Sequence, residues 1–465
     1  MLSVGSYQVI TAWSVLDSVF TQKHHFPFNQ SKEKIAVMQS VKQLVGGIGN
    51  GQRLVNIGDR IIIFVAVLVG CFANNSIAEE QSGHLLWKRH TIDSQSRGAD
   101  GTRLADLNGD GLLDIVTGWE QGGVSRVCLH PGHELVRERW PSVTVGKTPD
   151  VEDAVMFDLD SDGALDVICC CEGTQQSIFV HWSKGSDYLE ANSWRTTEVT
   201  PSTRKFRWMY AVPFDMNHDG QFDIVAGGKG DQSMLGWWEL PRDPRQVEDW
   251  KWHPMRKMGW LMSLEAVDMN RDGHKDLLFT DRKGEASGVY WLENPGPGTD
   301  ASVTTWQQHP VGGVNEEVMF LSHGDLNGDS KPEVVVAIRP SKIAIFQTDA
   351  DSRGNWNRTD LTIPSSYGTA KAPGIADFNL DGNPEIVFST ENARNPKMAI
   401  GMFVRSSPET DAWRLQPISG VDGIKHDLVV PIDLDADGDV DLITCEEVKN
   451  LGVIWYENPT LSPGQ

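Results

Sequence analysis

One acidic nine-residue pattern recurs seven times along the chain, and it constrains the fold more than any other feature of the sequence. The pattern is D-x-[DN]-x-D-[GS]-x-x-[DE], followed by apolar residues. Its copies begin at Asp106, Asp158, Asp215, Asp268, Asp325, Asp377 and Asp433, so that successive copies are 52, 57, 53, 57, 52 and 56 residues apart. Such a period is typical of repeat architectures, in which each repeat forms one supersecondary unit.

Each repeat contains signals for four short strands. Apolar segments lie on both sides of the acidic loop. A third segment ends in Trp-x-Glu-Asn-Pro, clearest at Trp291 and Trp455, and a fourth carries Trp-x-x-[HTQ], as at Trp306 and Trp413. Four antiparallel strands per repeat are typical of a propeller blade. The sequence therefore predicts an all-β, seven-bladed β-propeller, with repeats that start near residues 101, 153, 210, 263, 320, 372 and 428.

The two ends of the repeat region predict how the ring closes. The seventh repeat stops shortly after Pro459 and lacks a fourth strand, whereas residues 85–92, which include Trp87, match a fourth strand and precede the first repeat. Pairing this N-terminal strand with the C-terminal blade would remove exposed sheet edges, which favour aggregation. The alternative, an open β-solenoid, does not explain why one strand is missing at one end and extra at the other.

The acidic loops, the Trp-x-Glu-Asn-Pro strands (Trp291, Trp455) and the Trp-x-x-His strands (Trp87, Trp306) resemble those of the FG-GAP/VCBS repeat family, which includes the integrin α-chain propeller. The resemblance covers residues 85–459. It implies a propeller fold that binds calcium, but the family is only loosely tied to any one function.

Each acidic loop offers the oxygen donors that Ca²⁺ prefers. Side chains at positions 1, 3, 5 and 9 and the carbonyl at position 7 approach the about six to eight hard ligands of a calcium site. The turn preference of Asp, Asn and Gly explains one such loop, but not seven with an acid at position 9. We therefore expect up to seven structural Ca²⁺ ions, the fifth of them weakest because Ser330 replaces glycine at position 6. The predicted ligands are Asp106, Asn108, Asp110, Asp114, Asp158, Asp160, Asp162, Asp166, Asp215, Asn217, Asp219, Asp223, Asp268, Asn270, Asp272, Asp276, Asp325, Asn327, Asp329, Glu333, Asp377, Asn379, Asp381, Glu385, Asp433, Asp435, Asp437 and Asp441.

A second aligned position is charged in every repeat, 14 residues after the first aspartate of each loop. We expect these side chains to surround the channel mouth on the face opposite the acidic loops. Repeats 3 to 5 supply bases and the other repeats supply acids, which predicts a bipolar ring that binds a ligand, with Trp208 and Trp260 available to stack on a sugar. The alternative is solvated charge in a wet channel. The ring residues are Glu120, Glu172, Lys229, Arg282, Arg339, Glu391 and Glu447.

Two functional hypotheses follow from the charged face. The first is a non-catalytic module that binds a glycan or another protein. The second is a carbohydrate-active enzyme, of polysaccharide lyase or sugar dehydratase type, that acts on an acidic sugar with His426, Tyr210 and Arg282 as candidate catalytic residues. A structural role for His426 is the alternative. The net charge of −23 disfavours nucleic acid and anionic membranes as partners, and we expect a monomer.

The region before the repeats contains a predicted export signal. An apolar run over residues 61–72 is preceded by Arg53 and Arg60 and followed by a small-x-small site ending at Ala78. The run is shorter than the about 20 residues of a membrane span, so we expect no stable span in the mature chain. Residues 61–78 are interpreted as the signal region, 1–60 as an extension that a misassigned start would explain, and 79–465 as the propeller. The predicted location is periplasmic or extracellular, or alternatively lipid-anchored through Cys71.

Overall fold

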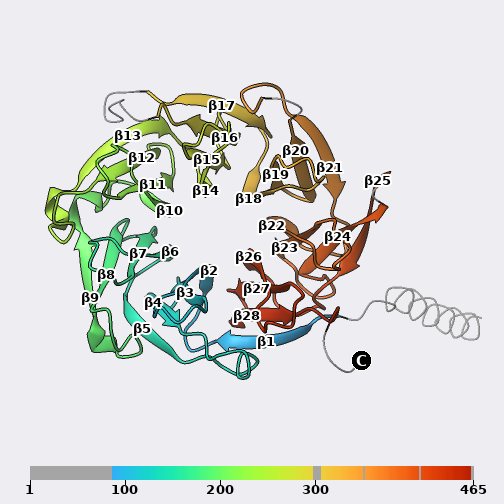
Figure 1. Ribbon diagram of the computed structural model, residues 1–465, viewed down its shortest axis with the longest axis horizontal. Coiled ribbons are helices and arrows are strands. Elements are labelled where there is room, and N and C mark those ends of the chain that lie inside the picture. Colours follow the sequence, from blue (N-terminus) through green and yellow to red (C-terminus); the bar gives the residue numbers. More distant parts are fainter. Residues whose placement is uncertain (1–85, 297–304, 349–350, 408–409, 462–465) are drawn as a thin grey trace, which may run out of the picture. The chain divides into compact units, whose positions relative to one another are not determined.

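Seven four-stranded antiparallel sheets surround a central axis in the computed structural model of the chain (Figure 1). The structure describes residues 86–296, 305–348, 351–407 and 410–461. These residues confirm the predicted all-β, seven-bladed propeller. The predicted N-terminal extension, the signal region and Cys71 lie outside the described residues. No helix in the described ranges is long and apolar enough to cross a lipid bilayer.

The first six blades each contain four strands that are consecutive in the sequence. Blade one contains β2 (Ala99–Ala105), β3 (Asp114–Trp119), β4 (Val124–Cys128) and β5 (Ser142–Lys147), and blade two contains β6 (Val151–Phe157), β7 (Asp166–Cys171), β8 (Ile178–Ser183) and β9 (Trp194–Val199). Blade three contains β10 (Arg207–Phe214), β11 (Asp223–Lys229), β12 (Met234–Glu239) and β13 (Lys251–Lys257), and blade four contains β14 (Leu261–Val267), β15 (Asp276–Asp281), β16 (Gly288–Glu293) and β17 (Gln307–Gly312).

Blade five contains β18 (Val318–Gly324), β19 (Glu333–Ile338), β20 (Lys342–Gln347) and β21 (Asn357–Thr362), and blade six contains β22 (Thr369–Ala376), β23 (Glu385–Glu391), β24 (Ile400–Ser407) and β25 (Thr410–Pro417). Short 3₁₀ helices occur at η1 (Ala191–Ser193), η2 (Thr200–Ser202) and η3 (Val247–Asp249). The first strand of each blade lies nearest the central axis and the last lies at the periphery (Figure 1). Because the blades repeat one strand order, the loops between their first and second strands share one face of the ring.

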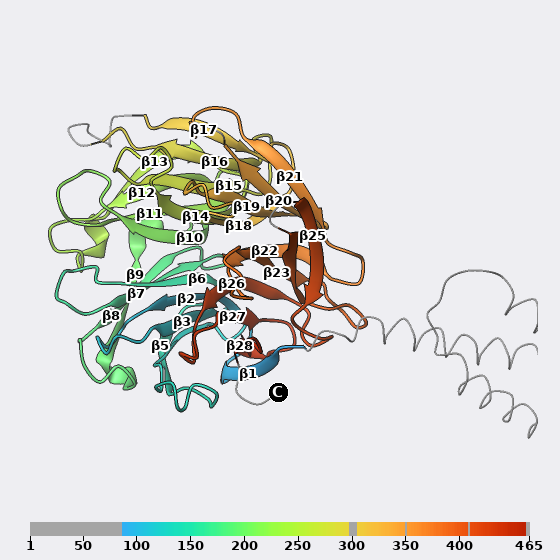
Figure 2. The same cartoon turned by 45° about the vertical axis from the view of Figure 1, so that its right-hand side comes forward.

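Blade seven joins the two ends of the described chain. It contains β26 (His426–Ile432), β27 (Asp441–Glu446), β28 (Gly452–Glu457) and β1 (Lys88–Asp93). The N-terminal strand β1 pairs antiparallel with β28, with His90 opposite Trp455. Both views show β1 along the outer edge of this blade (Figure 2). The predicted ring closure is therefore confirmed, and the fourth strand that is missing at the C-terminal end is supplied from the N-terminal end.

The middle strands of the blades form the core because neighbouring blades cover both of their faces. All residues of β3, β7, β15, β19 and β27 are buried, and β19 accordingly reads Glu-Val-Val-Val-Ala-Ile without polar alternation. Strand β7 carries Cys169, Cys170 and Cys171, which are buried and free. Burial raises the pKa of the Cys170 and Cys171 thiols well above the ordinary value, so these cysteines pack as small apolar residues.

A repeated stack of tryptophan, histidine and glutamate explains the tryptophan motifs of the third and fourth strands. In blade four, the His309 ring stacks on Trp291 with centroids 4.4 Å apart, and its Nε2 atom lies 2.7 Å from Glu293 Oε2. The same arrangement recurs in blade three (Trp237, His253, Glu239) and in blade seven (Trp455, His90, Glu457). The blade that closes the ring thus uses the same side-chain packing as blades formed from consecutive strands.

Candidate functional site

The seven acidic loops share one backbone geometry. In the first loop, both oxygens of Asp106 accept backbone hydrogen bonds, from Gly109 and Asp110 to Oδ1 and from Gly111 to Oδ2. This curl requires a positive φ at the fourth as well as the sixth position of every loop, whereas sequence reasoning identified only the sixth. Ser330 adopts a φ of 64° at the sixth position. The residue pairs with positive φ are Gly109 and Gly111, Ser161 and Gly163, His218 and Gly220, Arg271 and Gly273, Gly328 and Ser330, Leu380 and Gly382, and Ala436 and Gly438.

The ninth residue of each loop has a structural role that sequence reasoning missed. Asp114 is buried, and its two oxygens accept backbone hydrogen bonds from Leu107 (2.9 Å) and His130 (2.8 Å). Burial raises the pKa of Asp114 to about 6 and that of Asp441 to about 8. The ninth carboxylate therefore links its loop to the segment after the third strand. The same two bonds recur at Asp166, Asp223, Asp276 and Asp441.

The donor atoms of the loops fit a hard divalent cation. In the second and seventh loops, three carboxylates approach within 4.8 Å of one another: Asp158, Asp160 and Asp162 in one, and Asp433, Asp435 and Asp441 in the other. Arginines from outside these loops partly offset this charge, because Arg245 pairs with Asp160 and Asp162 and Arg137 pairs with Asp435. Carboxylate, amide and carbonyl oxygens suit Ca²⁺ or Mg²⁺ better than a metal that prefers sulfur or nitrogen.

A cavity of about 380 Å³ opens at the channel mouth, on the face where the second strands end. Eight carboxylates and four cationic side chains line it, together with an apolar and aromatic wall. The carboxylates are Asp100, Glu120, Glu152, Asp153, Glu172, Glu391, Asp427 and Glu447. The cations are Lys229, Arg282, Lys371 and Lys425, and the remaining lining residues are Gly101, Met209, Tyr210, Trp260, Met262, Phe320 and Leu428.

The structure brings six of the seven predicted ring residues to this cavity: Glu120, Glu172, Lys229, Arg282, Glu391 and Glu447. Each lies at the end of the second strand of its blade or directly after it. Arg339 occupies the equivalent position in blade five but is not part of the lining. It pairs instead with Glu391 and with Glu317, whose Oε1 atom is 3.5 Å from Arg339 Nε.

Paired charges replace the predicted bipolar ring. Lys371 and Lys425 enter the acidic side: Lys371 Nζ lies 2.7 Å from Asp427 Oδ1, and Lys425 contacts Glu447. On the basic side, Arg282 Nη2 lies 2.7 Å from Glu317 Oε1. The 14-residue spacing identified one ring of charges, but the ion partners come from other positions of the repeat.

The first strands supply a second set of lining residues, which sequence reasoning missed. Every first strand has a register shift against its second strand near the channel mouth. A β-bulge disrupts side-chain alternation, so consecutive residues such as Met209 and Tyr210 can both line the cavity. One signal was available, because six lining residues lie six positions before the first aspartate of their loops: Asp100, Glu152, Met209, Met262, Lys371 and Asp427.

Two predicted site residues, Trp208 and His426, point into the blades instead. Both lie seven positions before the first aspartate of their loops, and the seven residues at this position are all 0% exposed. Trp208 donates a hydrogen bond from Nε1 to the Ser202 carbonyl oxygen. Burial lowers the pKa of His426 to about 4, so its neutral imidazole is enclosed and is not part of the cavity lining. The predictions that Trp208 stacks on a ligand and that His426 serves as a base in the cavity are therefore corrected.

Tyr210 and Trp260 form the aromatic part of the wall. The guanidinium of Arg103 lies 4.0 Å from the Tyr210 ring centroid and donates two hydrogen bonds to Asp153, at 3.0 and 3.1 Å. Burial raises the pKa of the Tyr210 hydroxyl above its ordinary value, so it stays protonated. Trp260 is surrounded by cations, with Arg282, Lys229 and Lys283 between 4.2 and 4.9 Å from its ring. A ligand that stacks on Trp260 must share its face with these cations.

Burial and neighbouring charges separate the pKa values of the acids in the cavity. Burial, reinforced by Asp427, raises the pKa of Asp100 well above the ordinary value. Burial acts the same way on Glu152. Burial also opposes ionisation of Asp427, but the ammonium groups of Lys371 and Lys425 lower its pKa to about 2. At neutral pH the cavity therefore combines carboxyl groups that retain a proton and can donate hydrogen bonds, Asp100 and Glu152, with the ionised Asp427, which accepts them.

Comparison with known proteins agrees with this architecture. Residues 158–226 and 325–388, which include the second and fifth acidic loops, match the model of the FG-GAP-like repeat. The chain is a seven-bladed propeller that contains FG-GAP-like repeats. The second match covers the loop with Ser330 at its sixth position, so the substitution leaves the repeat recognisable.

The chain is also similar to part of a curated protein, aldos-2-ulose dehydratase from Phanerodontia chrysosporium. The two are 23% identical over 175 residues, which is 32% of this chain and 19% of that protein. The similarity thus spans about a fifth of the relative. One similar solved structure is an Agrocybe aegerita lectin that recognises non-reducing terminal N-acetylglucosamine, with a TM-score of 0.43 and 15% identity over 70% of this chain and 81% of that chain. Another is YCF48 from Cyanidioschyzon merolae, with a TM-score of 0.45 and 10% identity over 80% of this chain and 99% of that chain.

Proposed function

We propose that the chain is a calcium-stabilised propeller that binds a neutral carbohydrate in the cavity at the channel mouth. The observation that carries this proposal is the composition of the cavity wall. Twelve ionisable side chains that can bond to hydroxyl groups stand beside the aromatic rings of Tyr210, Trp260 and Phe320. Sugars present hydroxyl groups at their edges and C–H groups on their faces, which match these two kinds of surface.

The dimensions of the cavity favour a small ligand over a protein partner. Its volume of about 380 Å³ falls within the ~300–1,000 Å³ that is typical of small-molecule sites. A stable protein complex instead buries about 800 Å² on each partner, usually on a flatter surface. Of the two ligand classes expected from the sequence, the glycan is therefore the better match.

The charge of the lining favours a neutral sugar over an acidic one. Eight carboxylates face four cations, and the cations already form ion pairs such as Lys371 with Asp427 and Lys425 with Glu447. A uronate or sulfate would enter a cavity with excess negative charge. Hydroxyl groups, by contrast, can donate to the carboxylates without adding charge.

The loop ions are assigned a structural role in this proposal. The acidic loops lie on the face of the ring opposite the cavity, so Ca²⁺ bound there would stabilise the blades without touching the sugar. Export remains a prediction from residues 61–78.

A glycan array followed by calorimetric titration of the best sugar tests the proposal. Trp260→Ala removes an aromatic wall and is expected to weaken binding at least tenfold. Trp413→Ala is the matched control, because Trp413 is partly buried on β25 outside the cavity, and it should leave the affinity unchanged. Equal affinities for both variants, or no sugar bound by the folded wild-type chain, would refute carbohydrate binding in this cavity.

Sugar dehydration is a second candidate function, favoured by the partial similarity to aldos-2-ulose dehydratase. Elimination of water breaks a C–H bond and a C–O bond and forms a C=C bond, so a base must accept the proton and an acid must protonate the departing hydroxyl. The protonated Tyr210 hydroxyl, held beside Arg103 in the cavity wall, is the candidate acid.

Formation of a conjugated enone from an aldos-2-ulose, followed by ultraviolet absorbance, tests this second function. Tyr210→Phe should reduce turnover at least a hundredfold while changing sugar affinity much less. Binding by the wild-type chain without any turnover would eliminate the enzymatic candidate and leave the binding proposal standing.

A further inference from the structure

Two blades carry a buried carboxylate directly before the charged ring residue of their second strand. Asp281 precedes Arg282 at the end of β15, Glu446 precedes Glu447 at the end of β27, and neither acid lines the cavity. We propose that Asp281 is a positioning residue of the cavity, which holds Trp260 in the wall where a sugar would stack; this inference rests on the proposed binding of a carbohydrate. The equivalent residues of the other five blades, 13 positions after the first aspartate of each loop, are uncharged: Trp119, Cys171, Gly228, Ile338 and Thr390.

The carboxylate of Asp281 accepts hydrogen bonds from the backbone of the segment that enters β14. Its Oδ1 atom accepts from the N–H groups of Gly259 at 3.0 Å and Trp260 at 2.9 Å. The Trp260 carbonyl oxygen in turn accepts from the Arg282 N–H at 2.8 Å. Both polar backbone groups of Trp260 are therefore tied to the end of β15. Because an N–H group that loses its acceptor on folding is unfavourable, removal of the carboxylate favours a rearrangement of this segment.

The same segment is packed tightly between two blades. A Cβ atom at Gly259 would lie 1.6 Å from the Lys283 carbonyl oxygen, so a larger residue does not fit there. On the side of blade three, the Gly230 N–H donates to the Gly259 carbonyl oxygen at 2.9 Å. Asp281 is itself held by Arg256, whose Nη1 atom lies 3.0 Å from Oδ2. The backbone in front of the tryptophan is thus fixed from both sides.

The orientation of the Trp260 indole depends on this backbone anchor. No residue in the described ranges accepts a hydrogen bond from its Nε1 atom. Its ring is surrounded by Arg282, Lys229 and Lys283, whose long side chains are flexible and can follow a displaced ring. The anchor therefore determines where the ring stands in the wall, and a displaced ring would offer a sugar a poorer stacking surface.

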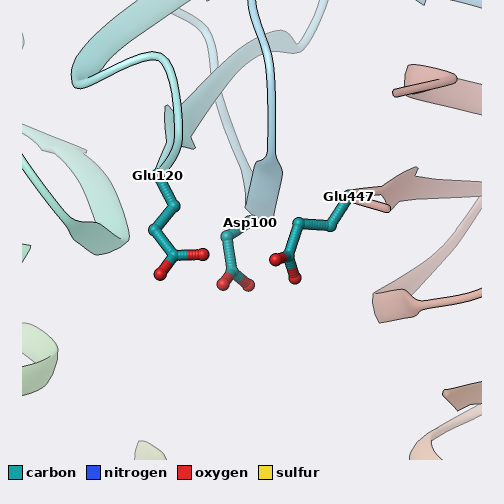
Figure 3. A group of neighbouring side chains, drawn as sticks. All are labelled: Asp100, Glu120 and Glu447. Atoms are coloured by element: carbon teal, nitrogen blue, oxygen red, sulfur yellow. The ribbon is translucent and has the colours of Figure 1, made fainter. Parts of the chain in front are cut away.

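Glu446 holds the equivalent segment of blade seven in the same way. It is 0% exposed, and its Oε1 atom accepts from the N–H groups of Ile424 at 2.9 Å and Lys425 at 3.4 Å. Lys425 lines the cavity and contacts Glu447, one of three carboxylates that point toward a common space at the channel mouth (Figure 3). In both blades that have an acid at this position, the acid therefore fixes a segment that supplies a lining residue.

Fluorine NMR of the full chain labelled with fluorotryptophan tests the position of Trp260 without any ligand. The signal that disappears in Trp260→Phe is that of Trp260. Asp281→Ala should shift or broaden this signal, while tryptophan signals from distant blades stay in place. Asp281→Asn keeps an oxygen that can accept from both N–H groups, so it should restore the wild-type signal in part. The control is Asp93→Asn, because Asp93 is also 1% exposed and bonded to an arginine but lies on the outer strand β1; it should leave the Trp260 signal unchanged.

Titration with D-glucose, as a neutral sugar probe, then tests the effect on binding. Asp281→Ala should weaken the affinity about tenfold in the wild-type background but cause no further loss in Trp260→Ala, since both changes remove the same wall. Thermal melting checks folding, and if Asp281→Ala is not folded, a smaller but measurable displacement of the Trp260 signal is expected in Asp281→Asn, whose amide cannot pair with Arg256.

Two results would overturn the positioning role of Asp281. One is an unchanged Trp260 signal in the folded variant, and the other is an equal loss of affinity with and without the Trp260 indole. A wild-type chain that does not respond to D-glucose would instead count against binding of a neutral sugar. In that case the spectra recorded without ligand would still decide whether Asp281 positions Trp260.

Discussion

Replacing Arg126 by methionine is expected to destabilise the propeller at the junction between the closing strand and the first blade. Asp93, the last residue of β1, is 1% exposed, and Arg126 on β4 is 7% exposed. Arg126 Nε donates to Asp93 Oδ2 at 2.7 Å, and the other guanidinium nitrogens donate to Thr144 and Ser142 at 2.8 Å. In the variant, Asp93 would keep the Gln95 backbone N–H at 2.9 Å but no cation.

The expected loss is about 3–5 kcal/mol, because removing one partner leaves a buried charge uncompensated. Asp93→Asn should cost a similar amount, since it leaves the Arg126 guanidinium without its anion. The double variant buries neither charge and is expected to regain at least about 2 kcal/mol relative to the sum of the two single losses.

Urea unfolding followed by tryptophan fluorescence, in buffer saturated with calcium, measures these differences. The unfolding midpoint should fall in each single variant while the denaturant slope stays constant, which indicates a change in stability alone. A loss below about 1 kcal/mol in Arg126→Met, or strictly additive losses in the double variant, would show that the pair does not hold β1 against blade one.

Three further predictions concern the loops and the core. Chelation of divalent ions should lower the melting temperature by several degrees. Each ion that binds only the folded state, at a hundredfold excess over its Kd, adds about 2.7 kcal/mol to the free energy of unfolding. An unchanged melting temperature would refute cation binding by the loops. After chelation, the free energy of unfolding should fall as the pH rises from about 4 to about 8. Burial raises the pKa of Asp166 and Asp223 to about 7 and that of Asp441 to about 8, so the folded state holds protons that the unfolded state has already lost. A rise in melting temperature across this pH range would contradict the reasoning. Trp291→Ala should lower the free energy of unfolding by about 3–5 kcal/mol, because the Trp291 indole is 0% exposed and stacks on His309. Trp413 is only partly buried, so Trp413→Ala should cost less. Equal losses in urea unfolding would be inconsistent with the stack.

The fold was predictable because its signals repeat. The seven acidic loops specified the number of blades, and the unpaired segment around Trp87 specified how the ring closes. The Trp-x-Glu motif at Trp455 could be recognised as a strand signal without knowledge of its contacts. Only the structure shows that its glutamate, Glu457, bonds a histidine stacked on the tryptophan.

The site was predictable only in part because a bulge changes which side chains reach the cavity. Glu120 and Glu447 follow regular second strands, so a constant spacing located them. Trp208 and His426 precede the irregular part of the first strands and point into the blades, whereas Tyr210 follows it and lines the cavity. Two-residue alternation cannot predict which side chains reach the cavity here, because a bulge shifts the alternation at a point that the sequence does not mark.

The pairing of Lys88 with Glu457 places the beginning and the end of the described propeller on adjacent strands of one blade. A short peptide linking these ends could replace the hydrogen-bonded seam by a covalent one, and new termini could then be opened between two other blades. Such a circular permutant would retain all seven sheets. Its mechanical weak point would move with the new opening, so the order in which blades detach under force should follow the position of the cut rather than the composition of any blade.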